Sequence, residues 1–479
     1  MKNESRLPRA GSLLVAALGV GALADGLLYG QEIGLGTTLF LFLLPVALWV
    51  LLRHNGIRTA WQSLGPLLAV FAFFAVMLTL RASEFVTGLN LLACVFLLAL
   101  LARFAVPGQL AELRLGELLG APFVLLGASL KRGAPAVSEV LMALKSTEKR
   151  QSIGPLFRGV LLSVPVLLVL VPLLASADAV FSRYVTELGK LFLPERWQEQ
   201  ALRLGLVLLT SWLVAGGLAL ALTAQRVLVA EKAPEELPLG FVEAMTVLSS
   251  VATVFGIFLW IQLAYLFGGA TRVLTVPSLT YADYARRGFA ELVTVAALTL
   301  ALILSLKATT KRTGKQPTHF AALSSLIVAE TLVLLLSAWR RMATYEAAYG
   351  ATQTRLHVDV FIVWLGLTLL WLVVTLWSRP WSSRFAIGGL ACALGFAASL
   401  NILNPDALVA HQNIQRWEKT GKLDSRTLYY LSDDARSEIT ALIKRLPAGE
   451  QRQYLEERLE RGSSKPKTWQ SWHAAAHWK

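Results

Sequence analysis

The chain has 479 residues, of which 55% are hydrophobic and 16% are charged, and its mean hydropathy is +0.56. These values lie far from those of soluble globular proteins and exclude that class. The formal net charge is +14. We attribute much of it to basic residues in cytoplasmic loops, which orient membrane helices and face anionic lipid, and we expect no nucleic-acid partner.

Long apolar segments predict an all-α, polytopic bundle of membrane-spanning helices in the lipid bilayer. About 20 apolar residues cross the hydrocarbon as a helix, because a helix pairs its backbone groups without water. Eleven segments fit, approximately at 11–30, 37–52, 64–80, 86–102, 158–175, 203–223, 240–268, 289–306, 320–338, 357–378 and 385–403. LLGAPFVLLGASL, at 118–130, is shorter and holds two glycines and a proline, so we expect it to be interfacial or re-entrant.

The Lys and Arg residues predict which end of the bundle faces the cytoplasm. With eleven spans and the N-terminus inside, cytoplasmic segments hold twenty-one of them and the opposite side eleven, leaving aside the C-terminal tail. Since basic loops are retained inside, we expect the N-terminus inside and the C-terminus outside. A span at 118–130 would reverse everything after it. Ala22-Leu23-Ala24 has the form of a signal-peptidase site, so cleavage there is the alternative for the first segment.

The chain is expected to divide into four regions. The loop at 103–157 contains PAVSEVLMALKSTEKR, which predicts an amphipathic helix on the cytoplasmic surface. The tail begins NPDALVAHQNIQRWEKTG, with an Asn cap, Pro at the first helical position and a terminal Gly, and indicates a small soluble helical domain outside the membrane. The regions are membrane helices 1–102, the cytoplasmic segment 103–157, membrane helices 158–403 and the helical tail 404–479.

The sequence favours neither a metal site nor a cofactor. Cys94 and Cys392 both fall inside predicted spans, so no disulfide framework or CxxC site is expected. Walker A, HExxH, GxSxG and GxGxxG patterns are absent from the sequence. We therefore expect no metal and no cofactor.

Polar clusters follow several spans on the expected outer side. One cluster alone is typical of a helix crossing the headgroup layer, with tyrosines in the aromatic belt and arginines reaching phosphate. Several on one side favour a binding site. In one cluster, Thr280 and Asp283 form a capping box. In another, a helix from 320 to 349 would be about 45 Å long and would extend beyond the hydrocarbon. The candidate binding residues are Asp178, Tyr281, Asp283, Tyr284, Arg287, Glu291, Arg341, Tyr345, Tyr349, Arg355, Asp406, Asn413 and Arg416.

Glu330, in SSLIVAETLVLLLSAW, falls at the middle of the span at 320–338. An ionised group there costs about 3 kcal/mol on insertion scales. Glu330 is either a protonated or paired glutamate buried between helices, or a carboxylate linked to proton or cation movement. Ser337 lies on nearly the same face, and Gln262 is a candidate polar partner from the span at 240–268.

Six motifs resemble those of a family of bacterial multi-pass membrane proteins that is catalogued only as a domain of unknown function. The resemblance covers about the C-terminal two thirds of the chain and implies an envelope membrane protein without an assigned activity. The last motif usually ends in Asn, so His473 is a departure. The motifs are SADAVF (176–181), YADYARRGFAELV (281–293), TYEAAYGATQTRL (344–356), NPDALVAHQNIQR (404–416), LDSRTLYYLSDDA (423–435) and WQSWH (469–473).

Two classes of function remain open. In the first, the protein is a permease or lipid-handling transporter, with Glu330 at mid-membrane and the outer cluster as a vestibule or lipid-headgroup site. In the second, it is a sensor or assembly scaffold whose outer tail binds an envelope protein. A transferase acting on a lipid-linked substrate is a third alternative. It would need an acid or base such as Asp283, Glu346 or His411 near the arginines, and because no spacing singles one out, we name no catalytic residue.

Overall fold

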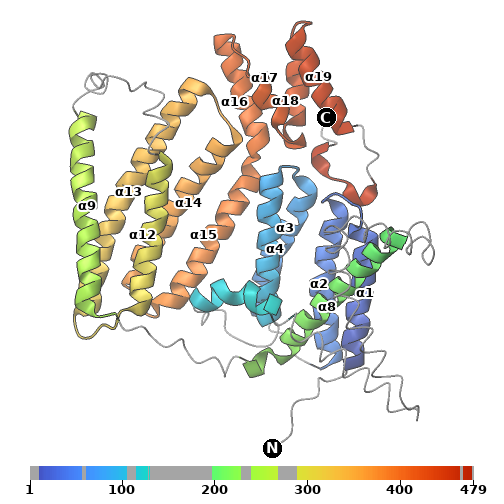
Figure 1. Cartoon of the computed structure of the whole chain (residues 1–479), viewed down its shortest axis with the longest axis horizontal. Helices are drawn as coiled ribbons and strands as arrows, with labels where there is room; N and C mark the ends of the chain where they lie inside the picture. Colours follow the sequence, from blue (N-terminus) through green and yellow to red (C-terminus); the bar gives the residue numbers. More distant parts are fainter. Residues whose placement is uncertain are drawn as a thin grey trace, which may run out of the picture. The chain divides into compact units, whose positions relative to one another are not determined.

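Figure 1 shows a computed structural model of the chain. It describes residues 10–56, 61–104, 115–127, 129, 197–227, 239–267, 289–463 and 468–476. Across these residues the regular structure is helical, and β pairing is limited to an isolated bridge between Leu239 and Thr310. The all-α fold predicted from the apolar segments is therefore confirmed.

Apolar helices coincide with the expected spans. Eight are long and apolar enough to cross a membrane, and three shorter apolar helices accompany them among the described residues. Of the expected spans, 158–175 lies outside the described residues, as does PAVSEVLMALKSTEKR. The helices are α1 (Ala10–Leu28), α2 (Leu35–His54), α3 (Trp61–Leu80), α4 (Glu84–Phe104), Leu115–Gly127, α8 (Trp197–Val227), α9 (Phe241–Phe267), α12 (Phe289–Thr309), α13 (Gln316–Tyr349), α14 (Gln353–Leu376) and α15 (Trp381–Leu403).

The helix Leu115–Gly127 covers most of the segment expected to be interfacial or re-entrant. At 1.5 Å per residue it is roughly 20 Å long, which is short of the roughly 30 Å hydrocarbon core. Its start is tied to two other helices: Leu115 N donates to Ser382 Oγ at 3.3 Å, and Arg103 pairs with Glu117 at 3.2 Å. These contacts hold its first turn against α4 and the start of α15.

The chain forms two compact units. The first comprises Met1–Gln31, Phe42–Thr59 and Phe123–Ala224, and the second comprises Glu32–Leu41, Ala60–Pro122 and Gln225–Lys479. In the first unit, α1 packs closely on α8, because a Cβ on Gly21 would stand 2.6 Å from the carbonyl oxygen of Val207. Arg203 of α8 also binds Asp25 of α1 through two nitrogens, with the shortest bond at 2.8 Å.

The second unit contains a layer of long helices. α13 packs against α9, α12 and α14, while α15 packs against both α14 and α4, as Figure 1 shows. The shared core of α9, α12, α13, α14 and the start of α15 is made of aliphatic and aromatic side chains, including the fully buried Phe320, Ile327 and Leu369. The helices are therefore joined by continuous apolar packing.

Two tryptophans of α14 fix its packing on α15. Trp364 covers Gly395 and Trp371 covers Gly388, where an added Cβ would stand 2.2 Å and 1.9 Å from the respective indole atoms. Both indoles also donate hydrogen bonds, from Trp364 to Ser399 Oγ at 3.0 Å and from Trp371 to the Arg384 carbonyl at 3.1 Å. Glycine at these two positions makes room for the indole rings between α14 and α15.

The helix α13 is longer than a membrane is thick. Its 34 residues span roughly 51 Å at 1.5 Å per residue, compared with roughly 30 Å of hydrocarbon. It ends at Gly350, whose φ of +85° is favourable for glycine and whose N–H bonds to the Glu346 carbonyl at 2.8 Å. The helix predicted to end there and to extend beyond the hydrocarbon is present.

The C-terminal residues fold into short helices around their own apolar core. Asn404 begins the first helix in a left-handed conformation with φ of +49°, Pro405 is its first residue, and Gly421 ends it, as predicted. Val409, Leu428 and other apolar residues of these helices pack together in the core. The elements are α16 (Pro405–Thr420), α17 (Ser425–Tyr430), η2 (Asp433–Ala435), α18 (Arg436–Ile443), α19 (Glu450–Ser463), η3 (Trp469–Ser471) and η4 (Ala474–Ala476).

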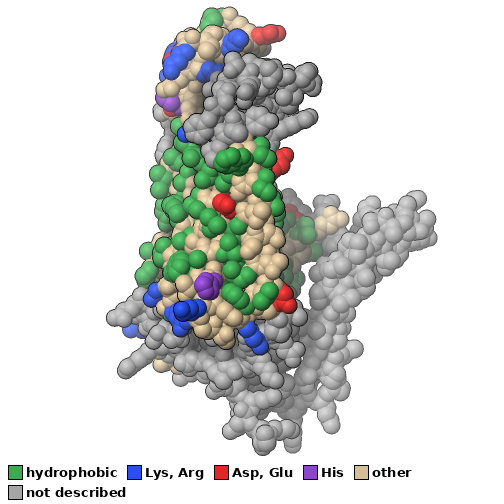
Figure 2. Space-filling view, turned by 90° about the vertical axis from the view of Figure 1, so that its left-hand side faces the viewer, with side chains coloured by type: hydrophobic (Ala, Val, Ile, Leu, Met, Phe, Trp, Pro, Cys, Tyr) green, Lys and Arg blue, Asp and Glu red, His purple; other side chains and the backbone are tan. Residues whose placement is uncertain are grey.

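A hydrophobic band crosses the face that carries α9. Figure 2 shows green apolar side chains over the middle of this face, with Lys and Arg above and below them. Several apolar side chains of α9 are strongly exposed, including Val254, Ile257 and Trp260. Such a band between two charged ends suits a surface in contact with lipid.

We predict that the two ends of α13 lie on opposite sides of the membrane. A topology reporter fused after Lys479 should be active only outside the cytoplasm, and one inserted after Lys315 only inside. The C-terminal helices contact the loop before α4 and the start of α14, so these segments should report the same side as Lys479. Equal activity at Lys479 and Lys315 would contradict the arrangement of the helices.

Candidate functional site

A buried pair of amides joins α4 to α15. Asn90 Nδ2 donates to Asn401 Oδ1 at 3.0 Å, and Asn401 Nδ2 donates to Asn90 Oδ1 at 2.6 Å. Arg81, just before α4, donates from Nε to the Asn401 carbonyl at 2.8 Å. Because both amides are fully buried, each satisfies the other in a place without water.

Asp434 links the C-terminal helices to the loop before α4. Its Oδ2 accepts hydrogen bonds from the backbone N–H of Ala82 and of Ser83, both at 3.0 Å. Burial raises the pKa of the Asp434 carboxyl above its ordinary value, while the two N–H groups and the charge of Arg81 oppose that rise. The carboxylate thus binds N–H groups that precede a helix, which otherwise have no partner within it.

Asp406 makes a second link, to the start of α14. It is fully buried; its Oδ1 accepts from Gln353 Nε2 at 2.5 Å and its Oδ2 from Ser432 N at 3.0 Å. Arg458 of α19 holds the same turn, since its Nη2 donates to the carbonyls of Leu431 at 2.8 Å and Ser432 at 2.7 Å. Segments far apart in the sequence are therefore fixed around the backbone at 431–432.

The turn between α13 and α14 lies directly on α16. Asn413 Nδ2 donates to the Ala351 carbonyl at 2.9 Å. A Cβ on Gly350 would stand 2.8 Å from both Asn413 Oδ1 and Arg416 Nη1, so this close approach requires glycine. Two motifs that the sequence placed on the same side of the membrane therefore meet.

An aromatic and cationic cluster stands beside this turn. The guanidinium of Arg355 lies 4.1 Å from the centroid of the Tyr345 ring, and the rings of Tyr345 and Tyr349 are 4.9 Å apart. Arg355 also donates to the Gly350 carbonyl. A cation over a tyrosine face is attracted by the ring quadrupole, so this cluster stiffens the end of α13.

These links enclose a cavity of about 780 Å³, which we call the junction pocket. Its walls come from the loop before α4, the start of α14 and the C-terminal helices. Motifs containing Gln353, Asp406, Tyr429 to Asp433, and His473 all contribute to it. The lining residues are Glu32, Ala82, Ser83, Glu84, Phe85, Gln353, His357, Asp406, Tyr429, Tyr430, Leu431, Ser432, Asp433, Arg458 and His473.

The junction pocket presents both donors and carboxylates. Arg458 is only 8% exposed, and its Nη1 has no hydrogen-bond partner, nor has the buried Nε2 of His357. The His357 ring stacks on Phe85 with centroids 4.4 Å apart. Burial lowers the pKa of Arg458, although a guanidinium stays charged in proteins. With Glu84 and Asp433 in the same lining, the pocket can bind a polar group that carries both charges.

Six of the eight described members of the predicted binding set belong to the two groups above. Asp406 lines the junction pocket, and Tyr345, Tyr349, Arg355, Asn413 and Arg416 surround the adjacent turn. Glu291 is exposed in the first turn of α12 and Arg341 is half-buried in α13. The other predicted members, which lie outside the described residues, are Asp178, Tyr281, Asp283, Tyr284 and Arg287.

Of the acids and bases considered for a transferase, Asp283 lies outside the described residues. Glu346 is half-buried near the end of α13. His411 is exposed on α16, where it lies 3.5 Å from Glu438 and 2.8 Å from Gln415. Neither lines the junction pocket, so we assign no catalytic role to them.

Glu330 faces a neighbouring helix. Its Oε1 lies 3.5 Å from the position that a Cβ on Gly256 of α9 would take, and its Oε2 is buried without a hydrogen-bond partner. Gln262 of α9 is half-buried, whereas Val254, Ile257 and Trp260 of the same helix are exposed. Glu330 does not line the junction pocket or the groove described next.

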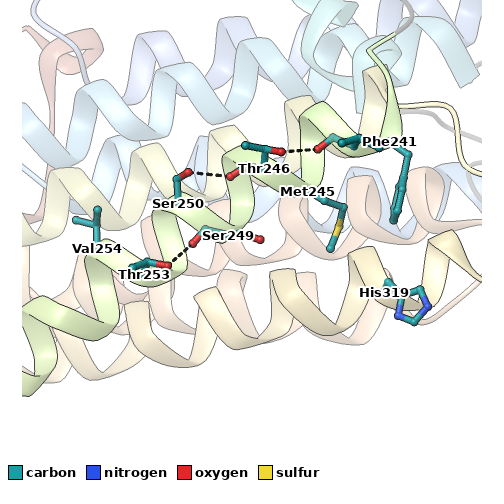
Figure 3. A pocket seen from close by; sticks show the side chains of 9 residues that line it. Phe241, Met245, Thr246, Ser249, Ser250, Thr253, Val254 and His319 are labelled. Atoms are coloured by element: carbon teal, nitrogen blue, oxygen red, sulfur yellow. Dashed lines mark hydrogen bonds between the residues drawn. The ribbon is translucent and has the colours of Figure 1, made fainter.

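A groove of about 810 Å³ runs along α9, and Figure 3 shows its hydroxyl side chains. Thr246, Ser250 and Thr253 each donate to the backbone carbonyl four residues earlier, at 2.8 to 2.9 Å. These hydroxyls are therefore satisfied within their own helix. Since small residues of this kind also occur where membrane helices pack, we assign no ligand site to the groove.

Sequence reasoning missed half of the junction pocket. Residues 82–85 comprise the end of a loop and the first two residues of α4, and they carry no motif. His357 follows the last motif residue of its segment. Arg458 stands in GEQRQYLEERLERG, where dense charge is typical of a solvated helix. The motifs supplied the other half, and Asp406 in NPDALVAHQNIQR, an acid in the first turn after the last span, is the lining residue that was also predicted as a binding residue.

The candidate spans and the C-terminal helices packed on them define a multi-pass α-helical membrane protein. A protein-family model described as a domain of unknown function, DUF4153, matches residues 68–442. The match covers more than half of the chain, so the chain belongs to this family, which agrees with the resemblance in its motifs. Comparison with curated proteins and with solved structures found no match.

We predict that Asp434 stabilises the junction through its acceptor oxygen and not through its charge. At pH 7, Asp434→Ala should lower the free energy of unfolding by about 1–3 kcal/mol, because the N–H groups of Ala82 and Ser83 lose their partner. Asp434→Asn retains an acceptor and should cost less. Thermal unfolding in detergent micelles measures both.

Comparing the unaltered protein with Asp434→Asn also gives a pH test. Because the folded pKa of Asp434 is raised, the folded state binds this proton more tightly than the unfolded state does. The contribution of Asp434 to stability should therefore fall as pH rises from about 3.9, the unfolded value, to the folded pKa, and stay constant above it. Asp434→Asn should lack this slope. An identical slope in both proteins would contradict the effect of burial on Asp434.

Proposed function

We propose that the protein is a permease or lipid-handling transporter of the bacterial inner membrane, with the junction pocket on its outer face as the site for a polar group. The observation that carries this proposal is the pocket between span ends and the C-terminal helices, with a buried donor on Arg458 and a buried ring nitrogen on His357 that both lack partners. Unpartnered buried donors are rare in folded proteins and favour a ligand that supplies acceptors.

The position of the pocket favours the lipid-handling form. Glu84 begins α4 and Gln353 begins α14, so the pocket lies where two spans leave the hydrocarbon, at the level of lipid headgroups. The donors suit a phosphate group, and the carboxylates of Glu84 and Asp433 suit an ammonium group. A zwitterionic headgroup such as that of phosphatidylethanolamine has both.

We predict that the protein moves labelled phosphatidylethanolamine across the bilayer of vesicles made of phosphatidylethanolamine and phosphatidylglycerol. Quenching of the fluorophore in the outer leaflet measures this movement. His357→Phe retains a ring that can stack on Phe85 but removes the polar Nε2 nitrogen, so it should slow the movement about tenfold. His411→Phe, the same change at an exposed position, should have no effect. Wild-type vesicles that quench no faster than empty ones would reject the lipid-handling form, and equal rates in both variants would reject the pocket.

A scaffold is the second candidate, and exposed aromatic residues support it. Tyr430 is 69% exposed at the rim of the pocket and Trp469 is 57% exposed in the closing motif. Aromatic side chains of this kind are enriched at protein interfaces, although tryptophans near a span end also suit the membrane interface. A photo-reactive residue in place of Tyr430 that forms one discrete adduct in intact cells, in a protein without transport activity, would favour the scaffold.

We predict a separate role for Glu330 if transport depends on protons. Glu330→Gln should assemble normally yet remove the pH dependence of transport in vesicles, because the amide cannot release a proton. Its contact with α9 near Gly256 should tolerate this near-isosteric change. Retained pH dependence in Glu330→Gln, together with lower stability in Glu330→Leu, would make Glu330 a structural residue instead.

A further inference from the structure

A buried lysine lies at the opposite end of α13 from the junction pocket. Lys307, in the last turn of α12, is only 6% exposed. Its Nζ donates to the carbonyl of Leu376, the last residue of α14, at a long 3.4 Å. The ammonium also lies 5.5 Å from the ring centroid of Phe320 and 5.9 Å from that of Trp381. One long bond leaves most of its donor capacity unused.

Arg312 completes a cationic cluster with Lys307. Its Nη2 donates to the Lys307 carbonyl, and its guanidinium lies 4.7 Å from the centroid of the same Phe320 ring. Its Nη1 is buried without a hydrogen-bond partner, as is Thr310 Oγ1. Burial lowers the pKa of Arg312, but an arginine remains charged near neutral pH. Two buried polar atoms that follow Lys307 in the chain, Thr310 Oγ1 and Arg312 Nη1, thus have no hydrogen-bond partner.

The charges around this cluster do not cancel. Those that act on Lys307 are both positive and come from Arg312 and Arg379. None of the ion pairs formed by described residues includes these three cations. Arg379 is exposed, so water screens its charge. The C-termini of α12 and α14 supply roughly half a negative charge each, which leaves roughly one positive charge on the buried Lys307 and the half-buried Arg312. Buried charge without compensation is costly, so an anion would stabilise this arrangement.

We propose that Lys307, Arg312 and Thr310 form a site for a phosphate group between the α12–α13 and α14–α15 connections. The lysine supplies a point charge, the arginine supplies paired N–H groups, and the threonine supplies a hydroxyl. The cluster stands at the ends of α12 and α14, where basic pockets between membrane helices bind anionic headgroups. The phosphate belongs either to an anionic lipid or to a soluble phosphate compound.

Titration of the full-length protein in detergent micelles tests the site. The probes are phosphatidylglycerol, the zwitterionic phosphatidylcholine and inorganic phosphate, and the readouts are lipid retention in native mass spectrometry and the melting temperature. Lys307→Gln and Arg312→Gln should each weaken retention of phosphatidylglycerol at least about tenfold. Lys315→Gln removes one charge from an exposed position in the same connection and should change retention little. Arg312→Lys retains the charge and should recover part of the binding.

The probes separate the two sources of phosphate. A rise in melting temperature with phosphatidylglycerol alone identifies lipid, and a rise with inorganic phosphate identifies a soluble ligand; either supports the site if Arg312→Gln abolishes it. The site is rejected if phosphatidylglycerol binds no better than phosphatidylcholine and inorganic phosphate causes no rise. It is also rejected if Lys315→Gln loses as much binding as Arg312→Gln does.

Discussion

Two buried carboxylates hold the C-terminal helices against the membrane bundle, and the junction depends on them. Asp434 accepts from the backbone before α4, and Asp406 accepts from Gln353 at the start of α14. A carboxylate removed from water is destabilising unless hydrogen bonds surround it. Each acid is therefore stable only while its loop stays in place, so the two carboxylates fix the position of the C-terminal helices as well as adding to stability.

The same constraint creates the junction pocket. Asp406 and Arg458 hold the backbone at 431–432 from two sides, and this turn stands over the span ends that carry Phe85 and His357. Rigid walls of this kind let the pocket retain unpartnered donors, because local collapse would require breaking the buried hydrogen bonds. The proposed headgroup site and the proposed phosphate site use one principle at opposite ends of the bundle: fixed buried donors without protein acceptors.

Local patterns predicted the helices but not the contacts between them. Hydropathy located the spans, and Asn404, Pro405, Gly350 and Gly421 marked helix ends because those residues act through their own backbone. Asp406 was predicted as a site residue from its place after the last span. The pairing of Asn90 with Asn401, and of Asp434 with the loop before α4, joins positions more than 300 residues apart. No periodicity or capping rule carries information about such distant pairs. The role of Arg458 was equally hidden, because it stands among many charged residues in its helix.

Hydrogen exchange at the backbone of Ala82 and Ser83 tests the central claim most directly. These amides lie in a short connection between two helices, where exchange would be fast without a partner. The account predicts slow exchange at both positions in full-length protein in nanodiscs, and much faster exchange in Asp434→Ala, with the exposed Gly314 fast in both. Fast exchange of Ala82 and Ser83 in the unaltered protein would show that the C-terminal helices are not held on the bundle.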